Sequence, residues 1–201
     1  MAAVVEPRAR LLVCAGSARA DSLHRQLAHA AEAALIEAGA EATFVEIGEY
    51  GLPVFNQDIE DAEGTPAAAR ELRDMLIAHD GLALASPEYN GSYSPLLKNT
   101  IDWVSRPMPG ERHSTAFHSK VAGLMSITPG PGGGREGLRH LRELLEWLGV
   151  TVITEQLAVP RSSQAFDAEG KLARAADAQA LQVWAAHLVN SVRRSKSRSI
   201  S

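Results

Sequence analysis

The chain has 201 residues with a formal net charge of −4 at pH 7, and 45% of its residues are hydrophobic. This composition predicts a folded protein with a sizeable core, and the charge excludes the basic field that a nucleic-acid partner would need. Cys14 is the one cysteine, which excludes an internal disulfide, and no stretch is long and apolar enough to cross a bilayer, so we expect a cytoplasmic protein that binds no membrane.

Short apolar runs alternate with longer amphipathic runs along the chain. The apolar runs predict strands at 10–16, 42–47, 81–86, 120–127 and 150–155. Leucine and alanine at helical spacing predict helices at 22–39, 66–79, 94–104, 135–149 and 175–192. Strands separated by helices of crossover length indicate an α/β fold, with a parallel sheet and helices on both faces, in one domain over residues 1–192.

Some segments stand apart from this alternation. Cys14, inside an apolar run, and Trp147 and Trp184, at helical spacing with leucines, are expected in the core. The segment 47–65 is predicted to be irregular, and the apolar groups of its LPVF sequence favour a subunit contact. The basic tail 193–201 lacks periodicity, and we expect it to be disordered.

The loop after the first predicted strand favours binding of a phosphate. Gly16 permits a tight turn, and Ser17, Arg19 and Ser22 bring two hydroxyls and a guanidinium to the start of a helix, whose unpaired N–H groups attract an anion. The alternative is an ordinary helix cap by Asp21 or Ser22 with a solvated arginine. No G-x-G-x-x-G fingerprint follows the first predicted strand and no G-x-x-x-x-G-K-[ST] loop occurs, so a terminal monophosphate fits better than a dinucleotide or a nucleoside triphosphate.

The loops after the third and fourth predicted strands have the residues to flank a flat ring. In PEYNG (87–91), turn formers enclose a carboxylate, a phenol and an amide, and the alternative is a loop that caps the next helix. The segment 126–137 holds five glycines and two prolines, which lets backbone approach a ligand closely, and the alternative is a flexible connection. Together the loops suggest a phosphate at one end and a planar ring at the other, the outline of flavin mononucleotide (FMN).

Four stretches carry a family resemblance: GSARADSLHRQLA, LPVFNQD, SPEYNGSYSPLLKNTIDW and PGPGGGREGLRHLRELLEWLG. In unbroken order they resemble the NADPH-dependent FMN reductases of the flavodoxin-like superfamily, a group that includes bacterial chromate and quinone reductases. The resemblance implies a flavodoxin-like three-layer sandwich with strand order 2-1-3-4-5 and a homodimer or homotetramer. It also implies FMN as the cofactor and NADPH or NADH as the electron donor.

The resemblance also assigns residues to the cofactor. Those expected to hold the FMN phosphate, through side chains or backbone amides, are Ser17, Arg19, Ser22, Leu23 and His24. At the last of these the family usually has asparagine. Those expected to line the isoalloxazine ring and ribityl chain are Pro87, Glu88, Tyr89, Asn90 and Gly91, with Ser126 and the glycine loop closing the other side. We expect no catalytic side chain and no metal site, because the flavin carries the redox chemistry.

The activity implied by the resemblance is transfer of hydride from NAD(P)H to FMN, followed by reduction of a small-molecule acceptor. Expected acceptors are quinones, azo compounds, metal oxyanions such as chromate, or free flavin. One alternative is a flavodoxin-type electron carrier reduced by a partner protein, and another is a cofactor-free interaction protein on the same fold. Because carriers are usually strongly acidic, a net charge of −4 favours an enzyme.

Overall fold

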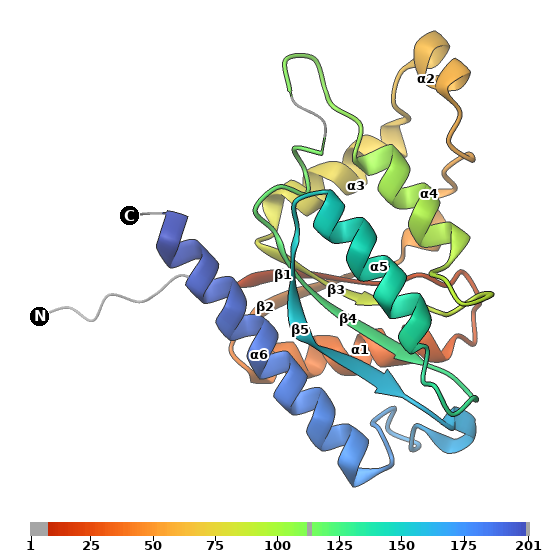
Figure 1. The fold of residues 1–201 in the computed structure, drawn as a ribbon, viewed down its shortest axis with the longest axis vertical. Helices are drawn as coiled ribbons and strands as arrows, with labels where there is room; N and C mark the ends of the chain where they lie inside the picture. Colours follow the sequence, from red (N-terminus) through yellow and green to blue (C-terminus); the bar gives the residue numbers. More distant parts are fainter. Residues whose placement is uncertain (1–7, 112–113, 200–201) are drawn as a thin grey trace, which may run out of the picture.

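In the computed structural model, which describes residues 8–111 and 114–199, five parallel strands form one sheet (Figure 1). The strands are β1 (Arg10–Ala15), β2 (Glu41–Val45), β3 (Gly81–Ala85), β4 (Val121–Ile127) and β5 (Thr151–Val159). Their order, β2-β1-β3-β4-β5, confirms the predicted topology. Every residue of β3 and β4 is buried, as expected for central strands that are covered on both faces.

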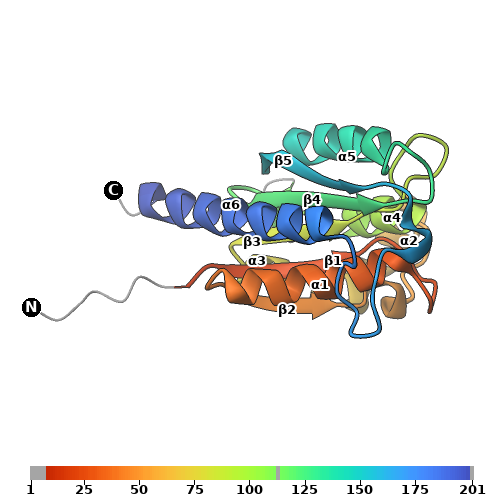
Figure 2. The same ribbon diagram turned by 90° about the horizontal axis from the view of Figure 1, so that it is seen from below.

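Helices cover both faces of the sheet and confirm the three-layer sandwich. One face packs against α1 (Leu23–Glu37) and α6 (Ala175–Ser199), which lie side by side in Figure 2. The other face packs against α3 (Ala67–Ala78), α4 (Pro95–Val104) and α5 (Arg135–Trp147). Residues of β1 alternate between the two cores, with Leu11 and Val13 toward α1 and α6 and Leu12 and Cys14 toward the other helices.

Cys14 is buried, as the sequence predicts. Burial raises the pKa of its thiol to about 12, and the negative charge of Glu46 adds to the shift. The thiol therefore stays protonated at neutral pH and packs as a small hydrophobic side chain.

The prediction that both tryptophans lie in the core is correct for Trp184 and wrong for Trp147. Trp184 is 2% exposed and packs against Gly123 of β4. A Cβ at Gly123 would lie only 2.6 Å from the Trp184 Cζ2 atom. Trp147 is 87% exposed. At about 100° per residue it lies roughly 180° around α5 from Leu138, so it points away from the leucine stripe that faces the sheet.

The expectation of a disordered tail is wrong for the residues that the structure describes, because α6 continues to Ser199. The Arg193 guanidinium donates to the Gly39 carbonyl at 3.0 Å, and Lys196 pairs with Asp80 at 2.8 Å. Positive side chains in a last turn also complement the negative end of the helix dipole. None of the described helices, α6 included, combines the length and the hydropathy of a membrane span.

The segment 47–65 contains regular structure, contrary to prediction. It forms a 3₁₀ turn, η1 (Ile47–Tyr50), and a short helix, α2 (Gln57–Glu63), which begins where the Asn56 side chain accepts the Asp58 amide. The LPVF stretch between them is held by α4. The Asn99 side chain accepts the Phe55 N–H at 2.8 Å, and the Trp103 indole N–H donates to the Pro53 carbonyl at 2.7 Å.

Candidate functional site

The loops that follow β1, β3 and β4 meet at the carboxyl edge of the sheet. The Gly16 amide donates to the Ala85 carbonyl at 2.8 Å, and the Ser86 amide donates to the Met125 carbonyl at 2.9 Å. A Cβ on Gly16 would lie 2.8 Å from the Ser94 hydroxyl oxygen, so the first loop rests directly on the start of α4. The topology thereby assembles the predicted loops at one place, where open parallel sheets bind ligands.

The first loop combines helix capping with spare hydrogen-bond donors. Ser22 caps α1, since its hydroxyl accepts the Arg25 amide at 3.4 Å, and the Ser17 hydroxyl accepts the Arg19 amide at 3.5 Å. Each hydroxyl uses an oxygen lone pair in these bonds and keeps its own O–H to donate. The Arg19 side chain is exposed and pairs with no carboxylate of the described residues. Helix capping by Ser22 and binding of an anion by this loop are therefore compatible.

The backbone amides in the first turn of α1 and the His24 side chain have different surroundings. Backbone amides of Leu23 and His24 belong to the first turn, where N–H groups have no partner within the helix. The His24 side chain, in contrast, turns inward. Its Nε2 atom accepts the Ile127 amide at 3.3 Å and lies 3.3 Å from the Ser126 hydroxyl, which is fully buried. The His24 and Ser126 side chains therefore contact each other, which the sequence analysis did not anticipate.

Burial lowers the pKa of His24 to about 4. The imidazole is therefore neutral at physiological pH, which suits a ring nitrogen that accepts a backbone N–H. Because Nε2 is the acceptor, the proton of the neutral ring resides on Nδ1. His24 thus connects the first turn of α1 to the carboxyl end of β4.

The second loop is a two-residue hairpin. Tyr89 and Ser92 exchange backbone hydrogen bonds of 2.8 and 3.0 Å, and the residues between them, Asn90 and Gly91, have φ angles of 53° and 76°. Positive φ at both central positions defines a type I′ turn, which explains the Asn-Gly pair in the sequence. Tyr89 is 47% exposed at this turn, while Pro87 behind it is buried.

Glu88 ties the second loop to the third. Its Oε2 atom accepts the Gly137 amide at 3.0 Å, which caps the first turn of α5. A Cβ on Gly137 would lie 3.2 Å from the Glu88 side chain and 3.1 Å from the Ser92 carbonyl oxygen. The carboxylate that the resemblance assigned to the ring is therefore engaged with a helix N-terminus, a favourable place for a negative charge.

The glycine loop is fitted to its neighbours rather than merely flexible. Gly133 and Gly134 have φ angles of 64° and 82°, which side chains rarely adopt. A Cβ on Gly134 would lie 2.7 Å from the Ser126 Cβ, and one on Gly133 would lie 3.1 Å from the Ala158 carbonyl carbon. Both glycines are needed for the loop to pack against β4 and β5.

One contributor to this edge was missed by the sequence analysis. The Arg161 amide donates to the Gly130 carbonyl at 3.2 Å, and the Ser162 amide donates to the Thr128 carbonyl at 3.1 Å. The loop after β5 is therefore hydrogen-bonded to the glycine loop. β5 was predicted to end at 155, whereas it continues to Val159, so these residues were not placed at the site. In the described ranges no group of three histidine, cysteine or acidic side chains is arranged to hold a metal ion.

The donor set of the first loop fits a phosphate. Two hydroxyls, an unpaired guanidinium and helix N-terminal amides gather there, and the nearest carboxylate in sequence, Asp21, is exposed. A comparison with known families agrees with this chemistry, because the sequence model of the NADPH-dependent FMN reductases matches residues 9–164. The chain belongs to the NADPH-dependent FMN reductase family.

Two relatives support the assignment, and one solved structure shows the shared fold. The chain is 36% identical over 146 residues to an NAD(P)H-dependent FMN reductase of Pseudomonas aeruginosa, covering 69% of this chain and 76% of that protein. It is 34% identical over 173 residues to the NADPH:quinone oxidoreductase of Arabidopsis thaliana, covering 84% of each. The flavoenzyme FerB of Paracoccus denitrificans, an NAD(P)H:(acceptor) oxidoreductase, superposes with a TM-score of 0.79 at 24% identity over 92% of this chain and 98% of that one, which shows the shared fold.

Proposed function

We propose that the protein is an FMN-dependent oxidoreductase that takes hydride from NAD(P)H and reduces quinones. The observation that carries the proposal is the meeting of three loops at the carboxyl edge, with phosphate donors on one of them. The family assignment supports FMN and NAD(P)H, and the quinone oxidoreductase of Arabidopsis thaliana supports the acceptor. FMN, when bound, supplies the hydride acceptor and the route for electrons to the quinone.

In this proposal the chain's residues bind and orient the cofactor and supply no acid or base. Ser17, Arg19 and Ser22 hold the phosphate with the amides of Leu23 and His24. The hairpin residues Pro87, Tyr89, Asn90 and Gly91 line the ring from one side, and the glycine loop lines it from the other. Glu88, His24 and Ser126 act through the loops, because their side chains bond to neighbouring elements.

Replacement of Arg19 tests the phosphate assignment. A charge-assisted hydrogen bond contributes about 1.5–3 kcal/mol, so Arg19→Gln should weaken FMN binding about tenfold or more, measured by quenching of FMN fluorescence. Quinone reduction by the variant should recover when FMN is added in excess, since the phosphate only anchors the reacting ring. Arg8→Gln is a matched control, because Arg8 is also exposed and unpaired in the described chain but precedes β1 at the opposite edge. Equal FMN affinity in the two variants would refute the assignment.

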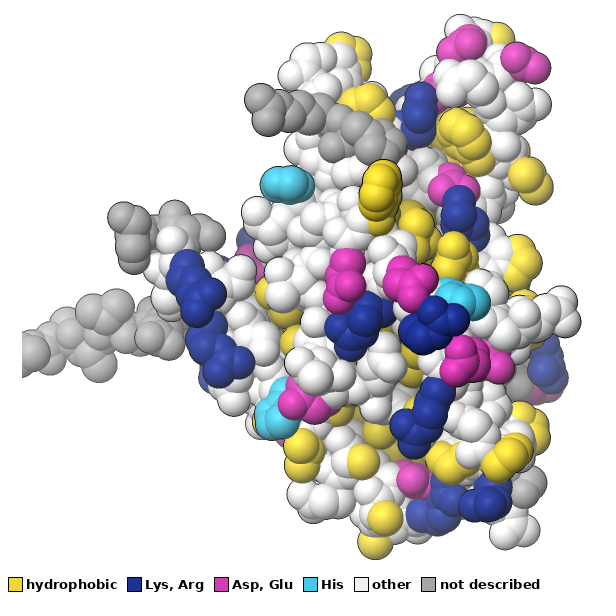
Figure 3. All heavy atoms as spheres, in the orientation of Figure 1, with side chains coloured by type: hydrophobic (Ala, Val, Ile, Leu, Met, Phe, Trp, Pro, Cys, Tyr) yellow, Lys and Arg dark blue, Asp and Glu magenta, His cyan; other side chains and the backbone are white. Residues whose placement is uncertain are grey.

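We also propose that the reductase is a homo-oligomer. Val54 is 82% exposed and Trp147 87% exposed, the two most exposed of the large hydrophobic side chains in the described chain. Figure 3 shows hydrophobic side chains over the side that carries α4, α5 and the segment before α2. A second copy that covers these groups would remove them from water. Sedimentation equilibrium should therefore give a dimer or tetramer, shifted toward monomer by Val54→Glu or Trp147→Glu; a monomeric wild-type protein would contradict the proposal.

A further inference from the structure

Most positive side chains in the described chain are matched by an acceptor. Arg106, for example, pairs with Glu60 at 2.7 Å, and Arg139 pairs with Glu143 at 2.6 Å. Within residues 8–111 and 114–199, the lysine and arginine side chains without such a partner are Arg8, Arg19, Arg135, Arg161, Lys171 and Arg198. The first and last of these lie near the chain ends. Arg19 lies in the loop after β1, Arg135 at the start of α5, and Arg161 and Lys171 in the segment after β5, so three unmatched arginines lie at the carboxyl edge.

A single monophosphate does not account for this concentration. Arg19 belongs to the first loop and is assigned to the FMN phosphate. Arg135 and Arg161 border the glycine loop instead. Both arginines are exposed, and neither has a carboxylate partner in the described chain. Two unpaired guanidinium groups beside one loop are an arrangement that a second anion would stabilise.

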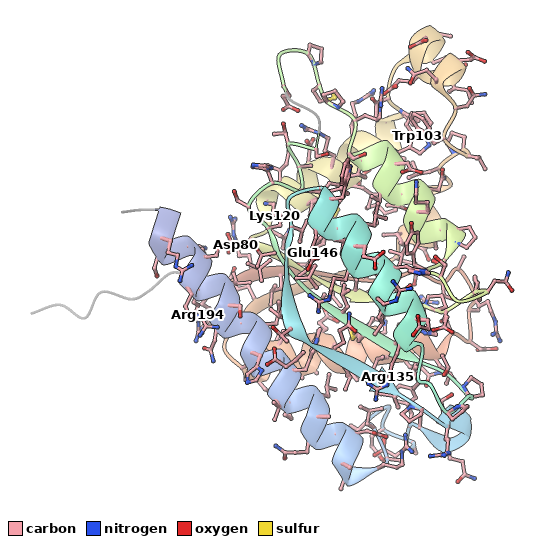
Figure 4. All side chains as sticks on the ribbon, viewed as in Figure 1. Asp80, Trp103, Lys120, Arg135, Glu146 and Arg194 are labelled. Atoms are coloured by element: carbon pink, nitrogen blue, oxygen red, sulfur yellow. The ribbon has the colours of Figure 1, made fainter. Side chains whose placement is uncertain are left out.

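The two arginines flank the same backbone. Arg135 opens α5 directly after Gly134, and Figure 4 shows it at the end of α5 that lies over the end of β5. The Arg161 amide donates to the Gly130 carbonyl at 3.2 Å, and a Cβ on Gly133 would lie 3.1 Å from the Ala158 carbonyl carbon. Both positions therefore border the glycine loop. Figure 3 shows lysine and arginine side chains gathered over the loop after β5.

The backbone of Arg161 is constrained in an uncommon conformation. Its φ and ψ angles are both 53°, in the left-handed region that residues other than glycine seldom occupy. The hydrogen bond to Gly130 holds it there, so the strand that ends at Val159 turns back toward the glycine loop. At Gly132 no atom lies within 4 Å of an added Cβ, which leaves this part of the loop open to a ligand.

We propose that Arg135 and Arg161 bind the 2′-phosphate of NADPH and so select it over NADH. This inference rests on the proposed function, because the nicotinamide of that donor must lie against the ring held between the hairpin and the glycine loop. The adenosine end of an extended dinucleotide then leaves along the loop toward β5. A phosphomonoester carries close to two negative charges at pH 7, which matches two guanidinium groups. NADH has no charge at this position.

The test measures both nucleotides with single and double variants. Arg135→Gln and Arg161→Gln should each raise the KM for NADPH about tenfold and leave the KM for NADH unchanged, with a larger effect in the double variant. Arg139→Gln is the matched control, since Arg139 lies one turn further along α5 but is already paired with Glu136 and Glu143, and it should change neither value. Equal losses for NADPH and NADH would overturn the proposal, because they would place the arginines on the shared pyrophosphate. Unchanged values would overturn it as well.

A binding measurement separates this inference from the proposed function. Calorimetric titration of the FMN-treated full chain with adenosine 2′,5′-bisphosphate needs no electron transfer. The wild-type protein and Arg139→Gln should bind this nucleotide at least about tenfold more tightly than adenosine 5′-monophosphate, and the Arg135→Gln, Arg161→Gln double variant should lose the difference. If the wild-type protein does not distinguish the two nucleotides, the 2′-phosphate site is refuted whatever the protein reduces. If it distinguishes them but reduces no quinone, the proposed function alone fails.

Discussion

His24 joins the first turn of α1 to the carboxyl end of β4. Its Nε2 atom accepts the Ile127 amide at 3.3 Å and lies 3.3 Å from the Ser126 hydroxyl oxygen. Burial lowers the pKa of the imidazole to about 4 from the ordinary 6.5, so the folded chain stabilises the neutral ring. A protonated Nε2 would turn an acceptor into a donor that faces a backbone N–H.

This contact predicts a pH dependence of stability. Because the unfolded chain binds a proton to His24 below about pH 6.5 and the folded chain does so only below about pH 4, the stabilisation is complete above pH 6.5 and is lost as pH falls through this window. Between pH 7 and pH 4 the loss amounts to roughly 3 kcal/mol in the free energy of unfolding. Urea denaturation at several pH values should show this slope in the wild-type protein and a smaller one in His24→Asn, which keeps an acceptor that does not titrate. Identical slopes would show that His24 does not titrate as described.

The surroundings of some residues could be predicted from the sequence, and those of others could not. The position of Ser17, Arg19 and Ser22 before a helix start could be predicted, because it depends on local sequence. The partner of Glu88 could not be predicted, since the Gly137 amide is 49 residues away and meets it only in the folded sheet. The partners of His24 lie more than 100 residues away and were equally hidden.

At the scale of helices and strands, a predicted element was placed correctly wherever one apolar stripe or run defines it. The ends of the elements and the exposed faces of the helices were predicted less accurately. β5 continues past the polar Glu155 and Gln156 because its register with β4 shifts between Ala122 and Leu124, which lets the strand resume pairing. Trp147 was misplaced because its spacing from the leucines indicates only that the segment is helical. Its exposure depends on its angle around α5, which puts it opposite the leucine stripe. The end of α6 was missed because its last turns are held by distant partners such as Asp80.

At the scale of the whole molecule, the two edges of the sheet differ in how their charges are matched. At the edge where the strands begin, Asp80 pairs with both Arg10 and Lys196. These cations lower the pKa of the Asp80 carboxyl, against the opposing effect of burial. At the carboxyl edge Arg19, Arg135 and Arg161 are left unmatched by the described chain. A net charge of −4 is compatible with unmatched arginines at one edge, and we propose that these attract phosphorylated cofactors.

We propose that the carboxyl edge binds FMN for direct reduction by a nicotinamide nucleotide. Anaerobic titration of the FMN-loaded protein with NADPH, followed through the visible absorbance of the flavin, tests it most directly. We expect prompt bleaching that is complete at one NADPH per bound FMN, and recovery of the absorbance when a quinone is added. Bound flavin that stays oxidised in the presence of excess NADPH would contradict it.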